Sequence, residues 1–387
     1  MKLLSKFIFL IFSFYSVQNI SAQNVNVCHL RISVLTCAPG EELYATFGHS
    51  AIRIIDSTKG SDLIYNWGTF NFDDPDFYTK FIRGKLLYYL AVDTFNNFMY
   101  EYEQDQRSVL EQVLQLNCEE KINIYNAIQN NLQGNNRFYH YDFLYDNCTT
   151  RIRDILFKNI PHLSIEKNII PAGVTSRDLI HVYVDKGGEP WTKLGMDILL
   201  GEKVDKPITN YAAMFVPDYL MLGIDKAETA DKHTIVLQKR LVLQTNPPNN
   251  STGKYVPLIV LSCICILLFA ACNLQYNQRK NVSRIIDSFL LYVTGLLGVL
   301  ILFMWFATDH TVCKNNYNII WALPTNFIAA FFIWKRPIWI RRYFYIVFFI
   351  YALFIATWFW LPQKFNISIF PVLLLLLFRF AKLATEP

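Results

Sequence analysis

Residues 141–154 read Y-D-F-L-Y-D-N-C-T-T-R-I-R-D and place a cysteine, Cys148, at the start of a helical pattern. The apolar residues that follow it recur on one helical stripe: Ile152, Ile155 and Leu156. Asp146 or Asn147 is in position to cap the first turn. The unpaired N–H groups and the positive end of a helix favour a thiolate, and the same N–H groups can receive an oxyanion in acyl transfer. This pattern indicates a position where a cysteine can act as a nucleophile.

A histidine upstream supplies a possible partner. His49 lies in F-G-H-S-A-I-R-I (residues 47–54), where β-branched residues predict a strand. A cysteine at a helix start and a histidine on a strand are the two parts that a thiol-dependent acyl-transfer enzyme needs. Each residue alone also has a structural interpretation. Cys148 could be a small buried residue or half of a disulfide. His49 could be a core histidine whose hydrogen bonds are satisfied within the protein.

The surroundings of these two residues predict a mixed α+β domain. Alternating apolar and β-branched residues predict strands at 30–35, 50–55, 63–68, 85–92 and 107–116, with 63–68 paired to 85–92. Three-to-four spacing of apolar residues predicts helices at 119–133, after Cys148, at 178–185 and near 191–201, and an apolar helical surface at 211–222. Residues 233–243 fit either a helix or an extended segment.

The first residues predict export from the cytoplasm. Lys2 and Lys6 precede a short apolar run, and Ser21-Ala22 ends the segment, so residues 1–22 are typical of a signal peptide. A retained N-terminal anchor is the alternative. Residues 23–246 are then the exported domain, and residues 247–255 form a linker, because proline, asparagine and glycine dominate its start.

Residues 256–387 read as an all-α membrane domain. Five apolar stretches predict five transmembrane helices, at 256–274, 286–307, 318–334, 343–361 and 367–383. The third stretch contains Pro324 and Asn326, which a helix bundle tolerates.

The distribution of basic residues predicts the orientation of these spans. With an exported N-terminal domain, the cytoplasmic segments hold Arg279, Lys280, Arg284, Lys335, Arg336, Arg341, Arg342, Arg379 and Lys382. The opposite loops hold only Lys314 and Lys364. This excess of cytoplasmic Lys and Arg predicts a multi-pass protein of the cell inner membrane whose exported domain faces the periplasm.

The net charge of +5 does not indicate a nucleic-acid partner. Residues 275–387 hold 11 Lys and Arg residues against 3 Asp and Glu residues, so they carry +8 and the rest of the chain carries −3. A basic nucleic-acid face is therefore not needed to explain the balance.

The eight cysteines favour neither a metal site nor a complete set of disulfides. The exported domain holds Cys28, Cys37, Cys118 and Cys148. If Cys148 is a working thiol, the other three cannot all pair within the domain. No Cys-x-x-Cys pair has metal-ligand spacing, so we expect no metal and no cofactor.

Three blocks resemble the Lnb family of the Bacteroides group. They are L-T-C-A-P-G-E-E-L-Y-A-T-F-G-H-S-A-I-R-I, Y-N-W-G-T-F-N-F and Y-D-F-L-Y-D-N-C-T-T-R-I-R-D. Similar blocks, F-A-T-D-H and N-Y-N-I-I-W-A-L-P-T-N, fall in the membrane domain. The family is assigned to lipoprotein N-acylation, which moves a fatty acyl chain from a phospholipid to the amino group of a lipid-modified N-terminal cysteine.

The exported domain is also similar to a circularly permuted papain-like fold, of the NlpC/P60 and lecithin-retinol-acyltransferase type, in which the histidine precedes the cysteine. The resemblance implies Cys148 as the nucleophile, His49 as the base, and a third polar residue that orients the histidine. Asn66 is the best candidate for that third residue by its order in the chain. A phospholipid acyl donor and a diacylated lipoprotein acceptor are the implied partners, joined by a thioester on Cys148.

The substrate contacts expected from these blocks involve six further residues: Tyr44, Ser50, Asn147, Arg151, Asp309 and His310. A solvated loop is the alternative for the last two, which follow the second span. Two other functions compete with acyl transfer. One is a membrane-tethered periplasmic cysteine peptidase or amidase that acts on cell-wall peptides, which one span would suffice to anchor. The other is a non-enzymatic assembly factor in which Cys148 forms a disulfide.

Overall fold

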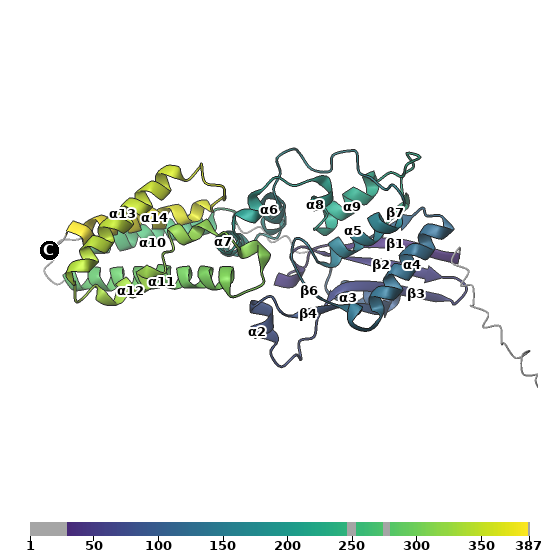
Figure 1. Ribbon diagram of the computed structural model, residues 1–387, viewed down its shortest axis with the longest axis horizontal. Coiled ribbons are helices and arrows are strands. Elements are labelled where there is room, and N and C mark those ends of the chain that lie inside the picture. The colour runs from purple at the N-terminus through teal and green to yellow at the C-terminus, as the bar shows by residue number, and fades with distance from the viewer. Residues whose placement is uncertain (1–28, 246–252, 274–278, 386–387) are drawn as a thin grey trace, which may run out of the picture.

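The chain forms two parts that follow one another along its longest axis: a domain built on a β-sheet and a bundle of apolar helices (Figure 1). The computed structural model describes residues 29–245, 253–273 and 279–385. The predicted signal peptide, residues 1–22, and most of the predicted linker lie outside the described residues.

A seven-stranded antiparallel sheet organises the first part, in the order β6-β4-β3-β2-β1-β5-β7. The strands are β1 (Leu30–Cys37), β2 (His49–Asp56), β3 (Ser61–Thr69), β4 (Leu87–Thr94), β5 (Val109–Leu114), β6 (Phe138–His140) and β7 (Val236–Leu243). All five predicted strands are present, and β3 pairs with β4 as expected. The segment that the sequence left open between helix and strand becomes β7, because β5 offers it a free edge.

Helices cover both faces of the central strands, which is why β1 and β2 are buried along almost their whole length. Alternate residues such as Ile32 and Ile52 face a core formed with α4, α5 and α9. Residues of the opposite parity, such as Leu35, pack against Phe98 and Tyr102 of α3. The sheet therefore has two apolar faces, and the helices supply the cover that each face requires.

The helices of this domain are α2 (Phe77–Ile82), α3 (Phe95–Gln104), α4 (Cys118–Leu132), α5 (Cys148–Asn159), α6 (Ser176–Lys186), α7 (Pro190–Leu199), α8 (Asn210–Ala213) and α9 (Pro217–Lys226). The 3-10 helices of the described residues are η2 (Leu43–Ala45), η3 (Gly134–Arg137), η4 (Glu202–Asp205), η5 (Thr311–Cys313), η6 (Tyr317–Ile320) and η7 (Ile367–Ile369). Helix α3 was not expected from the sequence. It buries only Phe98 and Tyr102, too few apolar positions to produce a clear helical period.

Four helices of the described C-terminal residues are long and apolar enough to cross a membrane. They are α10 (Val256–Asn273), α11 (Arg279–Phe306), α13 (Ile338–Thr357) and α14 (Phe370–Thr385). They correspond to the first, second, fourth and fifth predicted spans. A bidentate ion pair between Arg379 and Asp287, at 2.7 and 2.8 Å, joins α14 to α11 inside the bundle.

The third predicted span, residues 318–334, is wrong as a continuous helix. It consists of η6, an irregular turn that ends at Pro324, and α12 (Thr325–Phe332). Eight residues of α-helix rise only about 12 Å, less than half of a hydrocarbon core of about 30 Å.

This broken segment nevertheless runs between opposite ends of the bundle. At one end Asn318 donates a hydrogen bond to the main-chain carbonyl of Asp197 in the sheet domain, at 3.0 Å. At the other end the guanidinium of Arg284, close to the start of α11, lies 5.7 Å from the ring centroid of Trp334. The segment therefore extends along the length of the bundle, with helix over only part of its path.

Side chains of α13 form hydrogen bonds with polar groups of the broken segment. The Tyr351 hydroxyl donates to the main-chain carbonyl of Trp321. The amide of Asn326, which is fully buried, accepts from the Tyr343 hydroxyl at 2.6 Å. Non-helical backbone is tolerated at membrane depth where protein surrounds it, and Trp321 and Asn326 are both buried.

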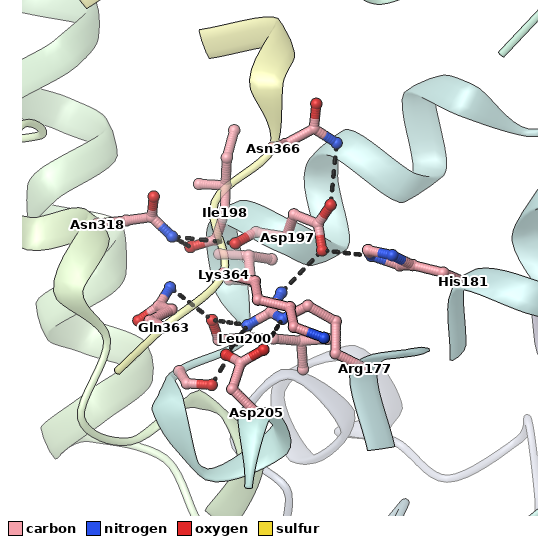
Figure 2. Close-up of polar contacts among 12 residues, drawn as sticks. Arg177, His181, Asp197, Ile198, Leu200, Asp205, Asn318, Gln363, Lys364 and Asn366 are labelled. Atoms are coloured by element: carbon pink, nitrogen blue, oxygen red, sulfur yellow. Dashed lines mark hydrogen bonds and ion pairs between the residues drawn. The ribbon is translucent and has the colours of Figure 1, made fainter. Parts of the chain in front are cut away.

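A buried polar network joins the two parts of the chain (Figure 2). Its centre is Arg177 of α6, whose side chain is fully buried. The guanidinium pairs with Asp197 of α7 at 2.7 Å and with Asp205 of η4 at 2.8 Å. It also donates to the carbonyl oxygens of Leu200 and Gly201.

Two loops of the helical bundle complete this network. Asn366 donates to Asp197 Oδ2 at 2.9 Å, and Gln363 donates to the carbonyl of Leu200 at 3.1 Å (Figure 2). These contacts come from the loop between α13 and α14, and Asn318 comes from the loop after α11. Both of these loops are therefore tied to the sheet domain by hydrogen bonds.

The loop after α11 also enters the core of the sheet domain. Val312 and Cys313 are buried among its apolar residues, and the Gly201 N–H donates to the carbonyl of Val312 at 2.9 Å. Both loops predicted to face away from the cytoplasm, those with Lys314 and Lys364, thus lie against the exported domain, in agreement with the predicted orientation.

Candidate active site

His49 is the first residue of β2, and the turn before it sets its direction. Gly48 has a φ of 76°, in the left-handed region that glycine adopts most readily. A Cβ atom at Gly48 would lie 2.6 Å from the main-chain oxygen of Cys37, the residue that pairs with His49 in β1. Glycine is therefore required at this position, and the partly exposed imidazole starts the strand at one end of the sheet.

Asn66, on the neighbouring strand β3, receives a hydrogen bond from this imidazole. The distance from His49 Nε2 to Asn66 Oδ1 is 2.5 Å. Because Nε2 carries the donated proton, Nδ1 is the nitrogen that remains for a thiol. The structure thus brings together the histidine and the asparagine that the sequence nominated.

The third strand also forms a wall of the site. The register of β3 shifts between Asn66 and Thr69, and Gly68, with a φ of 96°, lies in that irregular stretch. A Cβ atom at Gly68 would lie 3.6 Å from Cys148 Cβ and 3.9 Å from His49 Cε1. The main chain of Gly68 therefore borders both reactive side chains, which the sequence analysis did not anticipate.

Cys148 is the first residue of α5, and Asn147, one of the two capping residues that the sequence offered, is the N-cap. The Asn147 side chain accepts from the N–H groups of Thr149 and Thr150, at 2.9 and 2.8 Å. Its amide donates to two main-chain carbonyls, those of Phe143 and Phe215. This cap uses the next two N–H groups of the helix and leaves that of Cys148 without an acceptor among the described residues.

These bonds correct one expectation. Asn147 was predicted to contact substrate, but only 3% of it is exposed and both ends of its amide are bonded within the protein. Its contribution is to fix the start of α5.

The environment of Cys148 stabilises a thiolate. Burial alone would raise the pKa of the thiol, but the charge of His49 and its hydrogen bond outweigh burial and lower the pKa from 9.0 to about 7. Hydrogen bonds from the Thr149 hydroxyl and the Ser50 N–H act in the same direction. Burial likewise would lower the pKa of His49, yet the charge and hydrogen bond of Cys148 and the bond to Asn66 raise it. The pair therefore favours thiolate and imidazolium near neutral pH.

The other thiols on this side of the membrane lack such a partner. Burial raises the pKa of Cys37 and of Cys313 to about 12 in each case. Cys118 is disulfide-bonded, whereas Cys148 is a free thiol, so the structure does not contain the disulfide of the assembly-factor alternative at Cys148. Cys28 lies outside the described residues. No group of three or more His, Cys, Asp or Glu side chains that could hold a metal ion is present in the described part of the chain.

Comparison with known families now adds to this geometry. The family model described as the Lnb N-terminal periplasmic domain matches residues 16–181, which contain His49, Asn66 and Cys148. The model described as the Lnb transmembrane domain matches residues 249–385. The chain belongs to the Lnb family. No curated protein and no solved structure matches it.

The sheet domain is therefore the periplasmic domain of a membrane protein of the Lnb family, and three more predicted residues lie in it. Ser50 is fully buried; its main-chain N–H donates to the Cys148 sulfur, and its hydroxyl accepts from the Thr149 hydroxyl at 3.5 Å. Arg151 forms a bidentate ion pair with Asp146 at 2.6 and 2.8 Å and lies over the ring of Tyr139. Tyr44 is 68% exposed, with its ring close to Phe70. Of the three, Tyr44 has the side chain most open to a substrate.

Asp309 and His310 connect the two domains of this Lnb protein. The Asp309 N–H donates to the main-chain oxygen of Arg83 at 2.9 Å. The His310 ring donates to the main-chain oxygens of Phe81 and Ile82, at 3.2 and 3.1 Å. Both residues therefore hold the end of α2 against the membrane domain, while the described contacts of Cys148 come from β2, β3 and α5.

An aromatic surface beside the site was missed by the sequence analysis. It comprises Tyr44, Phe70, Phe72, Phe77, Tyr78 and Phe81, joined by ring contacts with centroid separations of 4.7 to 6.4 Å. Phe70 follows Gly68 by two residues, so this surface begins at the wall of the site. The density of aromatic residues between 70 and 81 was the available signal.

Proposed function

We propose that this chain is a lipoprotein N-acyltransferase of the cell inner membrane. It would move a fatty acyl chain from a phospholipid to the α-amino group of the diacylglyceryl-cysteine of an apolipoprotein. One observation carries the proposal: a free thiol at a helix start, whose pKa is lowered to about 7 beside His49, in a domain joined by hydrogen bonds to the loops of the membrane helices (Figure 2). Family membership supports it, because the motifs of the resemblance coincide with the residues of this site.

In the first step the Cys148 thiolate attacks the ester carbonyl carbon of a phospholipid. A C–S bond forms, and the tetrahedral oxyanion accepts a hydrogen bond from the free N–H of Cys148 at the positive end of α5. The C–O bond then breaks, and His49, as imidazolium, gives its proton to the leaving lysophospholipid alkoxide. A thioester on Cys148 and a neutral imidazole remain. Asn66 keeps the imidazole oriented throughout, through the bond to Nε2.

In the second step the α-amino group of the acceptor attacks the thioester carbonyl. His49 accepts the proton that the amine loses, a C–N bond forms, and the C–S bond breaks to restore the thiolate. Amine attack competes with hydrolysis, so exclusion of water favours transfer. The aromatic surface beside Gly68 supplies apolar side chains for that purpose.

Amide hydrolysis of cell-wall peptides is the competing function, because the same Cys148 and His49 pair can cleave an amide. The contact between the periplasmic domain and the membrane loops favours a lipid substrate. Val312 and Cys313 are part of the core of the catalytic domain, whereas a simple tether would not need such a contact.

The test is mass spectrometry of lipoprotein N-terminal peptides from cells that lack this gene. We expect diacylated peptides with free amino groups, full N-acylation after complementation with the wild type, and no rescue by Cys148→Ser. The purified full chain should also transfer an acyl group from phospholipid to a synthetic diacylated lipopeptide. Full N-acylation in the deletion strain, with no redundant gene, would overturn the proposal, and cleavage of cell-wall peptides by the purified chain would favour the competing function.

A further inference from the structure

A groove lies between α2 of the periplasmic domain and the end of α11. Its volume is about 320 Å³. The residues that line it are Thr79, Ile82 and Arg83 from α2 and its C-cap, and Phe303 and Ala307 from α11 and the residue after it. One wall thus belongs to the periplasmic domain and the other to a membrane span.

The groove lies where the span ends. Helix α11 ends at Phe306, and Asp309 and His310, three and four residues later, bond to the main-chain oxygens of residues 81–83. In Figure 1, α2 projects from the sheet domain on the side of the helical bundle. Helix α2 is therefore held at the depth of the outer headgroup region, where a span exchanges hydrocarbon for water.

The surface of α2 suits that position. Tyr78, Phe81 and Ile82 are 77%, 50% and 49% exposed, which is unusual for large apolar residues of a short helix in water. Aromatic and aliphatic side chains of this kind are typical of segments that lie in the membrane interface.

Arg83 places an uncompensated cation at this groove. Its side chain is exposed, and its guanidinium has no hydrogen-bond or ion-pair partner among the described residues. By contrast, Lys80 on the same helix pairs with Asp74 at 2.6 Å. A guanidinium that lines an apolar groove at headgroup depth matches a phosphodiester, because its planar fork binds two phosphate oxygens at once.

The aromatic surface connects this groove with the site. Phe81 stacks on Phe77, with centroids 6.1 Å apart, and Phe77 contacts Phe70 at 5.8 Å. Phe70 follows Gly68, whose main chain borders Cys148. An apolar track therefore leads from the groove to the thiol.

We propose that this groove binds the phosphate of the donor glycerophospholipid through Arg83, so that its ester-linked acyl chain enters along the aromatic surface toward Cys148. The inference rests on the proposed function for the identity of the reaction, but the binding of the lipid can be measured without any reaction.

The experiment uses the detergent-solubilised full chain with Cys148→Ser, which cannot form the thioester. Native mass spectrometry titrates two lipids with identical acyl chains, phosphatidylglycerol and the phosphate-free diacylglycerol. Arg83→Gln should weaken binding of phosphatidylglycerol about tenfold, as expected for loss of a charge-assisted hydrogen bond. Binding of diacylglycerol should not change, and Arg83→Lys should restore part of the affinity for phosphatidylglycerol.

Lys85→Gln is the matched control, since it removes another exposed cation from the same turn outside the groove, and it should leave both affinities unchanged. Equal losses in Arg83→Gln and Lys85→Gln, an equal loss for diacylglycerol, or no loss would overturn the inference. Displacement of the lipid by an equal concentration of inorganic phosphate would also overturn it, by showing a site for free phosphate. A wild-type chain that binds phosphatidylglycerol in this way but never forms a thioester would instead refute the proposed function.

Discussion

Cys148, Cys37 and Cys313 are all buried free thiols, and one neighbour separates the first from the other two. Burial is the largest of the effects that raise the pKa of Cys37 and of Cys313 to about 12. At Cys148 the charge and hydrogen bond of His49 reverse that effect, and Asn66 holds the ring in the orientation this requires. The chemical identity of the site therefore depends on one contact between side chains 99 residues apart in the sequence.

Replacement of His49 by alanine tests this dependence. A thiol is alkylated as the thiolate, so the rate of Cys148 alkylation by iodoacetamide should rise as the pH passes through about 7 in the wild type. In His49→Ala burial prevails and the midpoint moves to higher pH. The rate at pH 7 should then fall at least about tenfold. Peptide mass spectrometry across a pH series measures both quantities.

His140→Ala removes an exposed histidine of β6 and serves as the control. Its alkylation profile should match that of the wild type. An unchanged midpoint in His49→Ala would mean that the imidazole does not control the thiol.

Helix α5 presents Cys148 only because its first turn is fixed. The Asn147 cap bonds two N–H groups of the helix and two carbonyls of neighbouring segments, one of them Phe215 before α9. The helix start is thus tied to two other parts of the fold. The same bonds leave the Cys148 N–H free to receive an oxyanion.

Two cap substitutions separate this positioning from ordinary helix stability. Asn147→Ala should lower the free energy of unfolding by about 2 kcal/mol, because a buried cap and two further hydrogen bonds are lost. It should also slow Cys148 alkylation at pH 7, since the thiol is no longer held against His49. Thermal unfolding and the alkylation rate measure the two effects.

Asn117→Ala removes the exposed N-cap of α4, which forms a capping box of the same kind. It should cost about 1 kcal/mol and leave alkylation unchanged. Equal effects of both substitutions on alkylation would argue against a positioning role for Asn147.

Buried polar groups and apolar side chains cross between the two domains and join them. Arg177 neutralises Asp197 and Asp205 inside the periplasmic domain, and Asn366, Gln363 and Asn318 bind the same segments from the membrane side (Figure 2). This junction holds the periplasmic domain against the loops of the helical bundle.

Arg177→Leu should destabilise the whole chain. It removes the guanidinium from the buried carboxylates of Asp197 and Asp205, and loss of one partner of a buried pair costs about 3–5 kcal/mol. Thermal unfolding of the detergent-solubilised full chain should show a clear fall in the midpoint temperature, together with loss of acyl transfer.

Lys364→Gln provides the comparison, because its ion pair with Asp178 is exposed. Exposed pairs contribute less than about 1 kcal/mol, so the midpoint should change little. A similar small change in Arg177→Leu would show that the network does not stabilise the junction.

Much of this protein follows from local patterns in the chain. Strand alternation predicted β1 to β5, hydropathy predicted four of the membrane helices, and the family resemblance of three sequence blocks implied that His49, Asn66 and Cys148 meet. These features depend on the period or length of one segment, or on motifs carried by the segment itself.

The remaining features depend on contacts between distant segments. Asn147 reads equally well as a cap or as a substrate contact until the carbonyls of Phe143 and Phe215 are placed beside it. The third predicted span has the sequence of a helix, and only the structure shows that it is broken, with the Tyr351 hydroxyl bonded to the carbonyl of Trp321. In the sequence Arg83 does not differ from other basic residues; only the packing of α11 beside α2 forms the groove that it lines. Local sequence encodes the propensity of each segment, whereas burial, hydrogen-bond satisfaction and electrostatic environment arise only when the segments pack.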